Sequence, residues 1–231
     1  MDRVLSAARL HFARPCVVLG IPWLIVLSSF ALNAVIWGTT PVSETEGAGT
    51  GGLAALYVTV MVVHSQAVTQ LLPFGMGVGL SRRAFYLGTA LAAGVQALGY
   101  ALVLTVLGAV ESATGGFGLG LDFWRPAPIL VDNVVLQFVV YAVPLVACAA
   151  VGAGLGIIFK RWGPAGLYAL AVAAVAVIVG ALGLIGWLDA WQQVGGWFTD
   201  RSLVTFAVAL PLLVTAVVGG LSFAGLRRVV P

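Results

Sequence analysis

Polar side chains interrupt a largely apolar stretch, and four of them are the residues of this chain best suited to chemistry. On a helical wheel Tyr57 and His64 lie on one side, whereas Gln66 and Gln70 lie on another. Lipid cannot satisfy hydrogen-bonding groups, so at least one of these stripes is expected to face protein or water. One hypothesis is that they line a translocation path. The alternative is that His64 is a neutral structural side chain that hydrogen-bonds a neighbouring helix, for example at Gln96.

A glycine-rich segment followed by two arginines is the second candidate site. Its three alternating glycines weaken helix continuation and allow the chain to turn. The serine that follows them fits the N-cap of a new helix. The arginine charges alone are explained by anchoring the end of a membrane span. The candidate residues of this segment are Gly75, Gly77, Gly79, Ser81, Arg82 and Arg83.

Motifs for several common catalytic and metal sites are absent from the sequence. There is no P-loop GxxxxGK(S/T), no HExxH and no GxSxG. Paired carboxylates within an apolar run, which a proton-coupled carrier commonly uses as a relay, are absent too. Cys16 and Cys148 lie in apolar runs without metal-ligand spacing, so neither a disulfide nor a metal site is predicted. The chain is therefore expected to be neither an enzyme nor a self-powered carrier.

The sign of charge alternates along the chain. Six apolar runs separate the charged residues into seven clusters. The odd-numbered clusters hold Asp2 as the only acid, together with Arg3, Arg9, Arg14, Arg82, Arg83, Lys160, Arg161, Arg227 and Arg228. The even-numbered clusters hold Arg125 and Arg201 as the only bases, together with Glu44, Glu46, Glu111, Asp122, Asp132, Asp189 and Asp200. Cationic residues near span ends stay on the cytoplasmic side, so this pattern predicts six spans with both termini in the cytoplasm.

The composition agrees with a membrane protein. Charged residues make up only 8% of the chain, against roughly 25% in soluble domains. Six spans of about 20 residues use more than half of the 231 residues, which leaves no room for a soluble domain of useful size. The net charge of +3 does not indicate nucleic-acid binding, because the bases sit in pairs at span ends rather than on one soluble face.

The expected fold is all-α, with a single transmembrane domain over residues 1–231. Its first 15 residues alternate so that one helix face is apolar, which is typical of a helix lying in the membrane interface. A signal peptide is the competing interpretation, but the apolar run that follows is too long and lacks a clean cleavage site. The expected spans cover about 16–37, 53–74, 84–110, 133–159, 164–187 and 203–226.

Small residues recur at helical spacing in two of these spans. Gly152 and Gly156 form a GxxxG pattern, and Gly180, Gly183 and Gly186 recur at every third residue. Such faces let helices approach closely in lipid. Packing within one subunit and packing between two subunits both fit this spacing.

Residues 72–89 read LPFGMGVGLSRRAFYLGT. This stretch resembles the first cytoplasmic loop of ABC-2 type transporter permeases. Small bacterial members often have there a glycine, a small residue, Ser or Thr, Arg-Arg, any residue, Phe, two further residues and Gly. The layout of the whole chain, with an interfacial helix and six spans, also resembles that family.

The resemblance implies that residues 75–83 hold the coupling helix that contacts a separate ABC ATPase subunit. ATP and Mg²⁺ would bind to that partner, and this chain would carry no cofactor. The resemblance further implies a second permease chain in a homo- or heterodimer, with the second and fifth spans near the interface.

The expected function is that of a permease subunit of an ATP-driven exporter in the bacterial cell (plasma) membrane. The polar second span and the aromatic outer rim suggest an amphipathic cargo such as a drug, a peptide antibiotic or a lipid. The alternative is a non-transporting membrane scaffold or assembly subunit. A scaffold needs no polar path, so it predicts that His64, Gln66 and Gln70 tolerate simultaneous replacement by leucine.

Overall fold

The computed structural model describes residues 2–13, 15–41 and 50–226. Within these ranges the chain is all-helical and contains no strand, which confirms the expected all-α fold class. Some residues of the charge pattern lie outside the described ranges: Arg14, Glu44, Glu46, Arg227 and Arg228.

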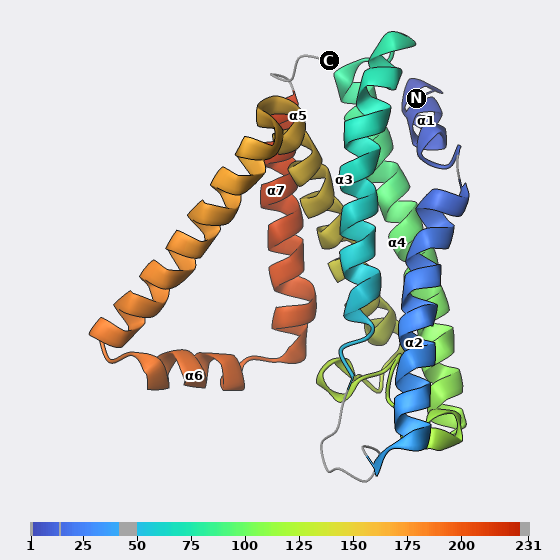
Figure 1. Cartoon of the computed structure of the whole chain (residues 1–231), viewed down its shortest axis with the longest axis vertical. Coiled ribbons are helices and arrows are strands. Elements are labelled where there is room, and N and C mark those ends of the chain that lie inside the picture. Colours follow the sequence, from blue (N-terminus) through green and yellow to red (C-terminus); the bar gives the residue numbers. More distant parts are fainter. Residues whose placement is uncertain (1, 14, 42–49, 227–231) are drawn as a thin grey trace.

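Long helices form a bundle from which one helical limb diverges (Figure 1). In chain order the elements are α1 (Asp2–His11), a π-helical turn (Cys16–Gly20) leading into α2 (Ile21–Thr39), α3 (Ala54–Gly77), α4 (Arg82–Ala113), α5 (Val134–Trp187), α6 (Trp191–Asp200) and a second π-helical turn (Thr205–Ala209) leading into α7 (Leu210–Leu226). Two short helical turns, Gly116–Gly120 and Ala127–Ile129, lie in the connection between α4 and α5.

Side-chain caps fix where two of the long helices begin. The Ser81 hydroxyl accepts a hydrogen bond from the backbone N–H of Ala84 at 3.2 Å, which caps α4. The Asn133 amide oxygen accepts one from the backbone N–H of Leu136 at 3.0 Å, which caps α5. Each cap satisfies one of the backbone donors that a helix start leaves unpaired.

Five helices of the described chain are long and apolar enough to cross a membrane. They are Cys16–Thr39, Ala54–Gly77, Arg82–Ala113, Val134–Trp187 and Thr205–Leu226. A helix rises about 1.5 Å per residue, so about 20 residues match the 30 Å hydrocarbon core. These five helices indicate a membrane protein.

The longest of them, α5, reverses direction at Gly163. This residue has φ 63° and ψ −157°, a conformation essentially restricted to glycine, and Pro164 follows it. The bend separates a first limb (134–162) from a second limb (164–187), which diverge from one point (Figure 1). The expected spans of about 133–159 and 164–187 place a short turn between them, at this point of the chain.

The first limb of α5 packs closely on α3. A Cβ atom on Gly152 would clash with the carbonyl group of Met61, and one on Gly156 would lie 2.7 Å from the carbonyl oxygen of Ser65. The GxxxG pattern of this limb therefore serves packing within the chain, because only glycine lets the two backbones approach so closely.

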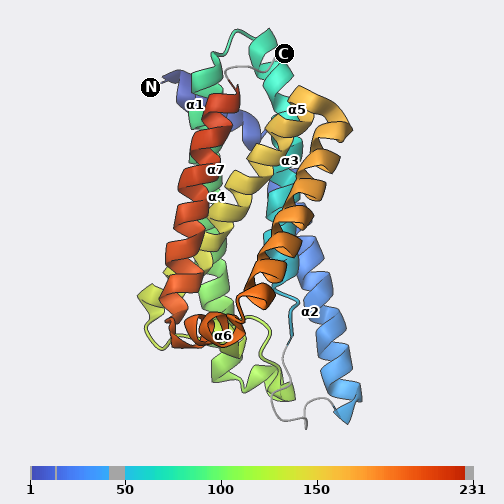
Figure 2. The ribbon, with the colours of Figure 1, turned by 90° about the vertical axis from the view of Figure 1, so that its left-hand side faces the viewer.

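The second limb of α5 lies apart from the bundle. Together with α6 and α7 it outlines an open triangle (Figure 1). In this triangle α6 runs between the end of the second limb and the beginning of the last helix, and it is seen lengthwise in Figure 1 and end-on in Figure 2. Trp187, at the end of this limb, is 83% exposed. A Cβ atom on Gly180 or Gly183 would meet nothing within 4 Å, whereas one on Gly186 would lie 3.8 Å from the ring nitrogen of Trp191. The first two glycines of this stripe are thus unpartnered in the described chain.

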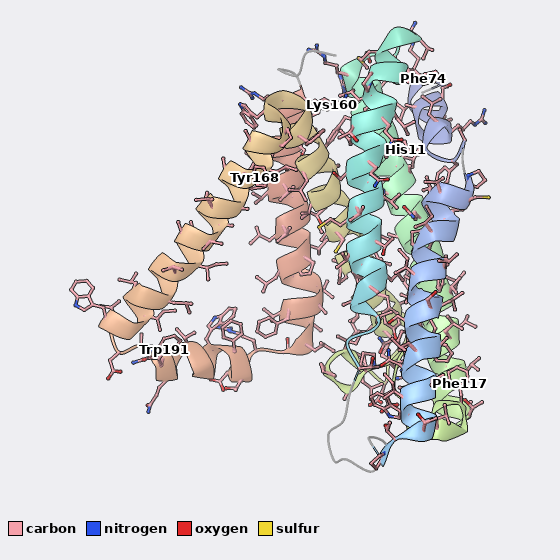
Figure 3. The ribbon with its side chains drawn as sticks, viewed as in Figure 1. His11, Phe74, Phe117, Lys160, Tyr168 and Trp191 are labelled. Carbon is pink, nitrogen blue, oxygen red and sulfur yellow. The ribbon has the colours of Figure 1, made fainter. Side chains whose placement is uncertain are left out.

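Charged side chains of opposite sign occupy opposite ends of the bundle. Figure 3 shows Lys160 and Phe74 at one end and Trp191 and Phe117 at the other. The first, here the basic end, comprises α1, the α3–α4 turn and the α5 bend, with Arg3, Arg9, Arg82, Arg83, Lys160 and Arg161. The second, here the acidic end, comprises α6 and the α4–α5 connection, with Glu111, Asp122, Asp132, Asp189 and Asp200 beside Arg125 and Arg201.

Candidate functional site

The four polar residues predicted to line one path face three separate cavities. His64 lines a partly open cavity between α3, α4, α5 and α7. Gln66 and Gln70 line a pocket of about 140 Å³ between α3 and the end of α1. Tyr57 lines a third pocket, near the acidic end. Tyr57 and His64 share a helix face but lie about 10 Å apart along the axis, so α3 brings only the two glutamines together.

The partly open cavity around His64 has a volume of about 110 Å³. Small side chains form most of its wall, and His64 itself is only 3% exposed. None of the described residues that line it is an acid, a lysine or an arginine. Its polar lining residues are His64, Tyr86, Thr89, Thr215 and Ser222.

The hydrogen bond of His64 determines which ring nitrogen carries the proton. Nδ1 lies 3.0 Å from the carbonyl oxygen of Val60, one turn earlier in α3. A carbonyl oxygen only accepts, so Nδ1 of the neutral ring is the donor and Nε2 is an acceptor. The suggested hydrogen bond between His64 and Gln96 is wrong. The Gln96 amide donates instead to the carbonyl oxygen of Val18 at 2.8 Å and to the Tyr100 hydroxyl at 3.1 Å.

Most hydroxyl groups of this cavity donate hydrogen bonds to backbone carbonyl oxygens. Tyr86 donates to a carbonyl of α7 at 2.6 Å. Thr89 and Thr215 each donate to the carbonyl oxygen four residues earlier, at 3.0 and 2.8 Å. Oxygen lone pairs and the Nε2 atom of His64 are what remains for a ligand. The cavity is therefore suited to a neutral hydrogen-bond donor.

A second buried histidine joins α1 to this cavity. The Nε2 atom of His11 lies 2.9 Å from the Oγ1 atom of Thr89, whose own proton goes to the carbonyl of Phe85. His11 must therefore donate through Nε2. Burial, together with the nearby His64, lowers the pKa of His11 from 6.5 to about 4. At neutral pH it is an uncharged link between α1 and α4.

Glycine allows α1 to cross α4 closely above this link. A Cβ atom on Gly88 would lie 2.5 Å from the Cβ atom of Ala7 and 2.8 Å from the backbone nitrogen of Ala8. The buried face of α1 thus includes Ala7, Ala8 and His11, whereas Leu5, which the helical wheel placed on the apolar side, is 43% exposed. The packing explains why a glycine stands at the end of the motif in residues 72–89.

The α3–α4 turn differs from the separate helix that the resemblance implied. Here α3 continues through Gly77, since glycine weakens a helix without breaking it. The chain then turns at Gly79, which has φ 81°. The Leu80 N–H donates to the carbonyl of Gly75 at 2.9 Å and the Gly79 N–H donates to that of Met76 at 3.0 Å, which is a Schellman motif.

The turn is short because the Schellman motif ends α3 and Ser81, directly after it, is the N-cap of α4. A buried anchor holds it: Phe85 is 1% exposed, and a Cβ atom on Gly75 would lie 3.3 Å from its ring. Apolar side chains stand outside the turn, because Phe74 is 56% and Val78 is 60% exposed. Arg82 and Arg83 form the first turn of α4 beside them.

At the acidic end a buried carboxylate organises the connection between α4 and α5. Glu111 is 1% exposed and accepts backbone hydrogen bonds from Phe123 at 2.9 Å, Trp124 at 3.0 Å and Arg125 at 3.0 Å. The Tyr141 hydroxyl donates to the carbonyl of Trp124 at 2.6 Å. A carboxylate that accepts several N–H groups fixes the backbone around it, so this acid has a structural role.

The pocket that contains Tyr57 is larger and more open, with a volume of about 550 Å³. It lies between α3, the first limb of α5, α6 and α7. Phe198 and Phe206 stack in it at 5.7 Å between ring centroids. Arg201 is the charged side chain among its described lining residues. An apolar pocket with one cation at its edge fits an amphipathic molecule.

Comparisons with known protein families, curated proteins and solved structures find no match for this chain. Within the described ranges, no group of three His, Cys, Asp or Glu side chains could hold a metal ion. Function therefore has to be inferred from the residues and their geometry.

Two functional or structural residues were missed by sequence reasoning. His11 escaped notice because a helical wheel counts histidine as polar, although it continues the stripe of Ala7 and Ala8. Glu111 was placed just beyond the end of the expected span 84–110, as one member of a charge cluster and without a role of its own. The backbone N–H groups that donate to its carboxylate follow 12 to 14 residues later, in a loop whose path the sequence does not specify.

Proposed function

We propose that this chain is the transmembrane permease subunit of an ATP-driven ABC exporter in the bacterial cell membrane. The observation that carries the proposal is the α3–α4 turn at the basic end, capped on both sides and anchored by Phe85. It presents Phe74, Val78 and Arg83 outward. A rigid, exposed turn with apolar and cationic side chains suits docking of a soluble ATPase.

In this proposal the two limbs of α5 count as two spans, which gives six. The basic end lies in the cytoplasm together with both termini, because cationic span ends stay on that side. The separation of charge between the two ends of the structure supports this orientation.

The partner ATPase would bind ATP and Mg²⁺ and push on the turn as its subunits close. The turn is joined to the membrane part through Phe85, which contacts Gly75 and whose ring centroid lies 5.8 Å from that of His11. Thr89, one turn further along α4, lines the His64 cavity. Movement of the turn would therefore shift α1 and α4 together and reshape this cavity.

The exposed second limb of α5 supports a second permease chain, identical or different. Its unpartnered glycines, Gly180 and Gly183, would allow close helix contact. The Tyr57 pocket supports an amphipathic cargo such as a drug, a peptide antibiotic or a lipid, with its apolar body on the aromatic rings and its polar part near Arg201.

The test first asks whether a P-loop ATPase is encoded beside this chain, and then measures whether that ATPase co-purifies with it. Val78→Glu combined with Arg83→Glu is expected to reduce ATPase recovery at least tenfold and to abolish export. Arg3→Glu, an exposed charge reversal at the same end, is the matched control and should retain both. Full ATPase recovery with the double variant would refute docking at this turn.

The dispersal of the polar residues of α3 favours a second candidate, a non-transporting scaffold. His64 faces a different cavity from Gln66 and Gln70, so these side chains do not form one continuous lining. Simultaneous replacement of the three by leucine distinguishes the candidates. An exporter is expected to lose transport, whereas a scaffold should keep its function.

A further inference from the structure

An apolar groove opens inside the bend of α5, and nothing in the described chain fills it. It has a volume of about 580 Å³ and lies between the first limb, the start of the second limb and α7. Its walls are mainly aliphatic. They include Ile157, Ile158, Leu170, Val218, Leu221 and Ala224.

One charged side chain marks the end of this groove. Arg161 is the cation among its described lining residues, and it is exposed. Its guanidinium carbon lies 4.4 Å from the ring centroid of Trp162, which also lines the groove. Lys160 precedes it at the same end of the molecule (Figure 3). An amphipathic ring beside a cation is typical of the level of lipid headgroups.

The positive charge at the bend has no nearby acidic side chain among those that the structure describes. The carboxylates with described side chains belong to the acidic end, on the far side of the bundle: Glu111, Asp122, Asp132, Asp189 and Asp200. Lys160 and Arg161 can therefore attract an anion from outside the chain.

The lining and charge of the groove determine which molecule it suits. Its walls are mainly aliphatic, it opens to the outside of the described chain, and one cation lies at its end. An acyl chain matches the aliphatic walls, and an anionic headgroup matches the cation.

We propose that this groove binds an anionic glycerophospholipid. One acyl chain lies between the limbs of α5 and α7, and the phosphate is held by Arg161 and Lys160. The acyl chain gains little from leaving other lipid chains, so preference among lipids comes from the headgroup charge. Basic pockets between membrane helices hold anionic headgroups in this way. The site requires neither transport nor an ATPase.

The test measures lipid binding to the purified full chain in nanodiscs. Phosphatidylglycerol with brominated acyl chains is titrated into a phosphatidylcholine background, and quenching of Trp162 fluorescence is obtained as the difference between the wild type and Trp162→Phe. Brominated phosphatidylcholine serves as the comparison lipid. In the wild type, half-maximal quenching of Trp162 is expected at a several-fold lower content of brominated phosphatidylglycerol than of brominated phosphatidylcholine.

Charge variants assign the headgroup contact. Each cation near a membrane surface contributes about 1 kcal/mol, or about fivefold in affinity. Lys160→Gln combined with Arg161→Gln is therefore expected to remove the preference for phosphatidylglycerol. Arg3→Gln, which removes an exposed cation of α1 that does not line the groove, should leave the preference unchanged.

A groove variant assigns the acyl chain. Ala224→Phe places a ring in the groove without changing charge, and it should reduce quenching by both lipids at least threefold. Equal quenching of the wild type by both lipids, or a double variant that keeps its preference, would overturn the proposal. Undiminished quenching in Ala224→Phe, or a disulfide between two copies of Ala224→Cys, would overturn it as well.

Discussion

The ring of His11 on α1 donates a hydrogen bond to the hydroxyl of Thr89 on α4, across 2.9 Å and 78 positions of sequence. Both residues are buried, and the Thr89 hydroxyl itself donates a hydrogen bond to the carbonyl oxygen of Phe85. These two consecutive hydrogen bonds fix α1 to α4, the helix that starts at the proposed ATPase-docking turn. Its contribution to stability can be measured directly.

Thr89→Val removes the acceptor and leaves the His11 N–H buried without a partner. An unsatisfied buried donor costs about 1–3 kcal/mol, so the free energy of unfolding should fall by that amount. Thr105→Val on the same helix is the control, because Thr105 only donates to the carbonyl of Ala101 within α4. Thermal unfolding in detergent measures both, and equal Tm values for the two variants would contradict the link.

Acid should weaken the protein through the same histidine. The pKa of His11 is about 4 when folded and 6.5 when unfolded, so between these values the unfolded chain binds more protons. Stability from this group is complete above about pH 6.5 and is lost as the pH falls towards 4. The full loss is about 3 kcal/mol, at 1.36 kcal/mol per pKa unit.

Comparison with His11→Gln isolates this effect from other titrating groups. Unfolding is measured at several pH values between 7.5 and 4.5 for both proteins. The stability gap between the wild type and the variant should narrow as the pH falls. A gap that stays constant over this range would show that His11 titrates normally in the folded protein.

Gly88→Ala tests the close crossing of α1 and α4. The new Cβ atom would lie 2.5 Å from that of Ala7 and 2.8 Å from the backbone of Ala8, so α1 has to shift. Overpacking of this kind costs about 1–3 kcal/mol. Gly94→Ala, where nothing lies within 4 Å, should instead be neutral or stabilise α4 by up to about 1 kcal/mol. Opposite signs for the two variants, measured by unfolding, are the expected result.

Local signals in the sequence predicted much of the helical framework. The type and position of Ser81 predicted a cap, and the structure shows its hydroxyl bonded to the N–H of Ala84. The turn at Gly163 and Pro164 was predicted as well, because glycine and proline end helices through their own backbone preferences. These features depend on a few neighbouring residues, so a sequence contains them in full.

Partners of buried polar groups were not predictable in the same way. His64 and Gln96 lie at similar depth, but the rotation of each helix decides which groups meet, and Gln96 bonds Val18 instead. The acidic residue Glu111 bonds a loop, whose path depends on packing against α2 and α4. Helix periodicity gives the face of a residue and not the identity of the helix that covers it.

Glu111→Gln tests the carboxylate at the acidic end. An amide has one acceptor oxygen where the carboxylate has two, so at least one N–H of the 123–125 backbone loses its partner. The expected loss is about 1–3 kcal/mol. Asp122→Asn is the matched control, since Asp122 is exposed, and it should change stability by less than about 0.5 kcal/mol. Equal stability of the two variants in denaturant unfolding would contradict the buried role of Glu111.

Gly163→Ala tests whether the α5 bend depends on a backbone conformation available only to glycine. At φ 63° and ψ −157° a Cβ atom introduces strain of about 1–3 kcal/mol, although no neighbouring atom lies within 4 Å. Gly180→Ala lies in the straight second limb with equally open space and should be neutral or slightly stabilising. The sites of the two variants differ in backbone conformation alone. Unfolding measures the cost of strain, and cross-linking between cysteines placed on the two limbs measures whether the bend is kept. If Gly163→Ala matches Gly180→Ala in both measurements, the bend tolerates a side chain and is set by the packing of α7 instead.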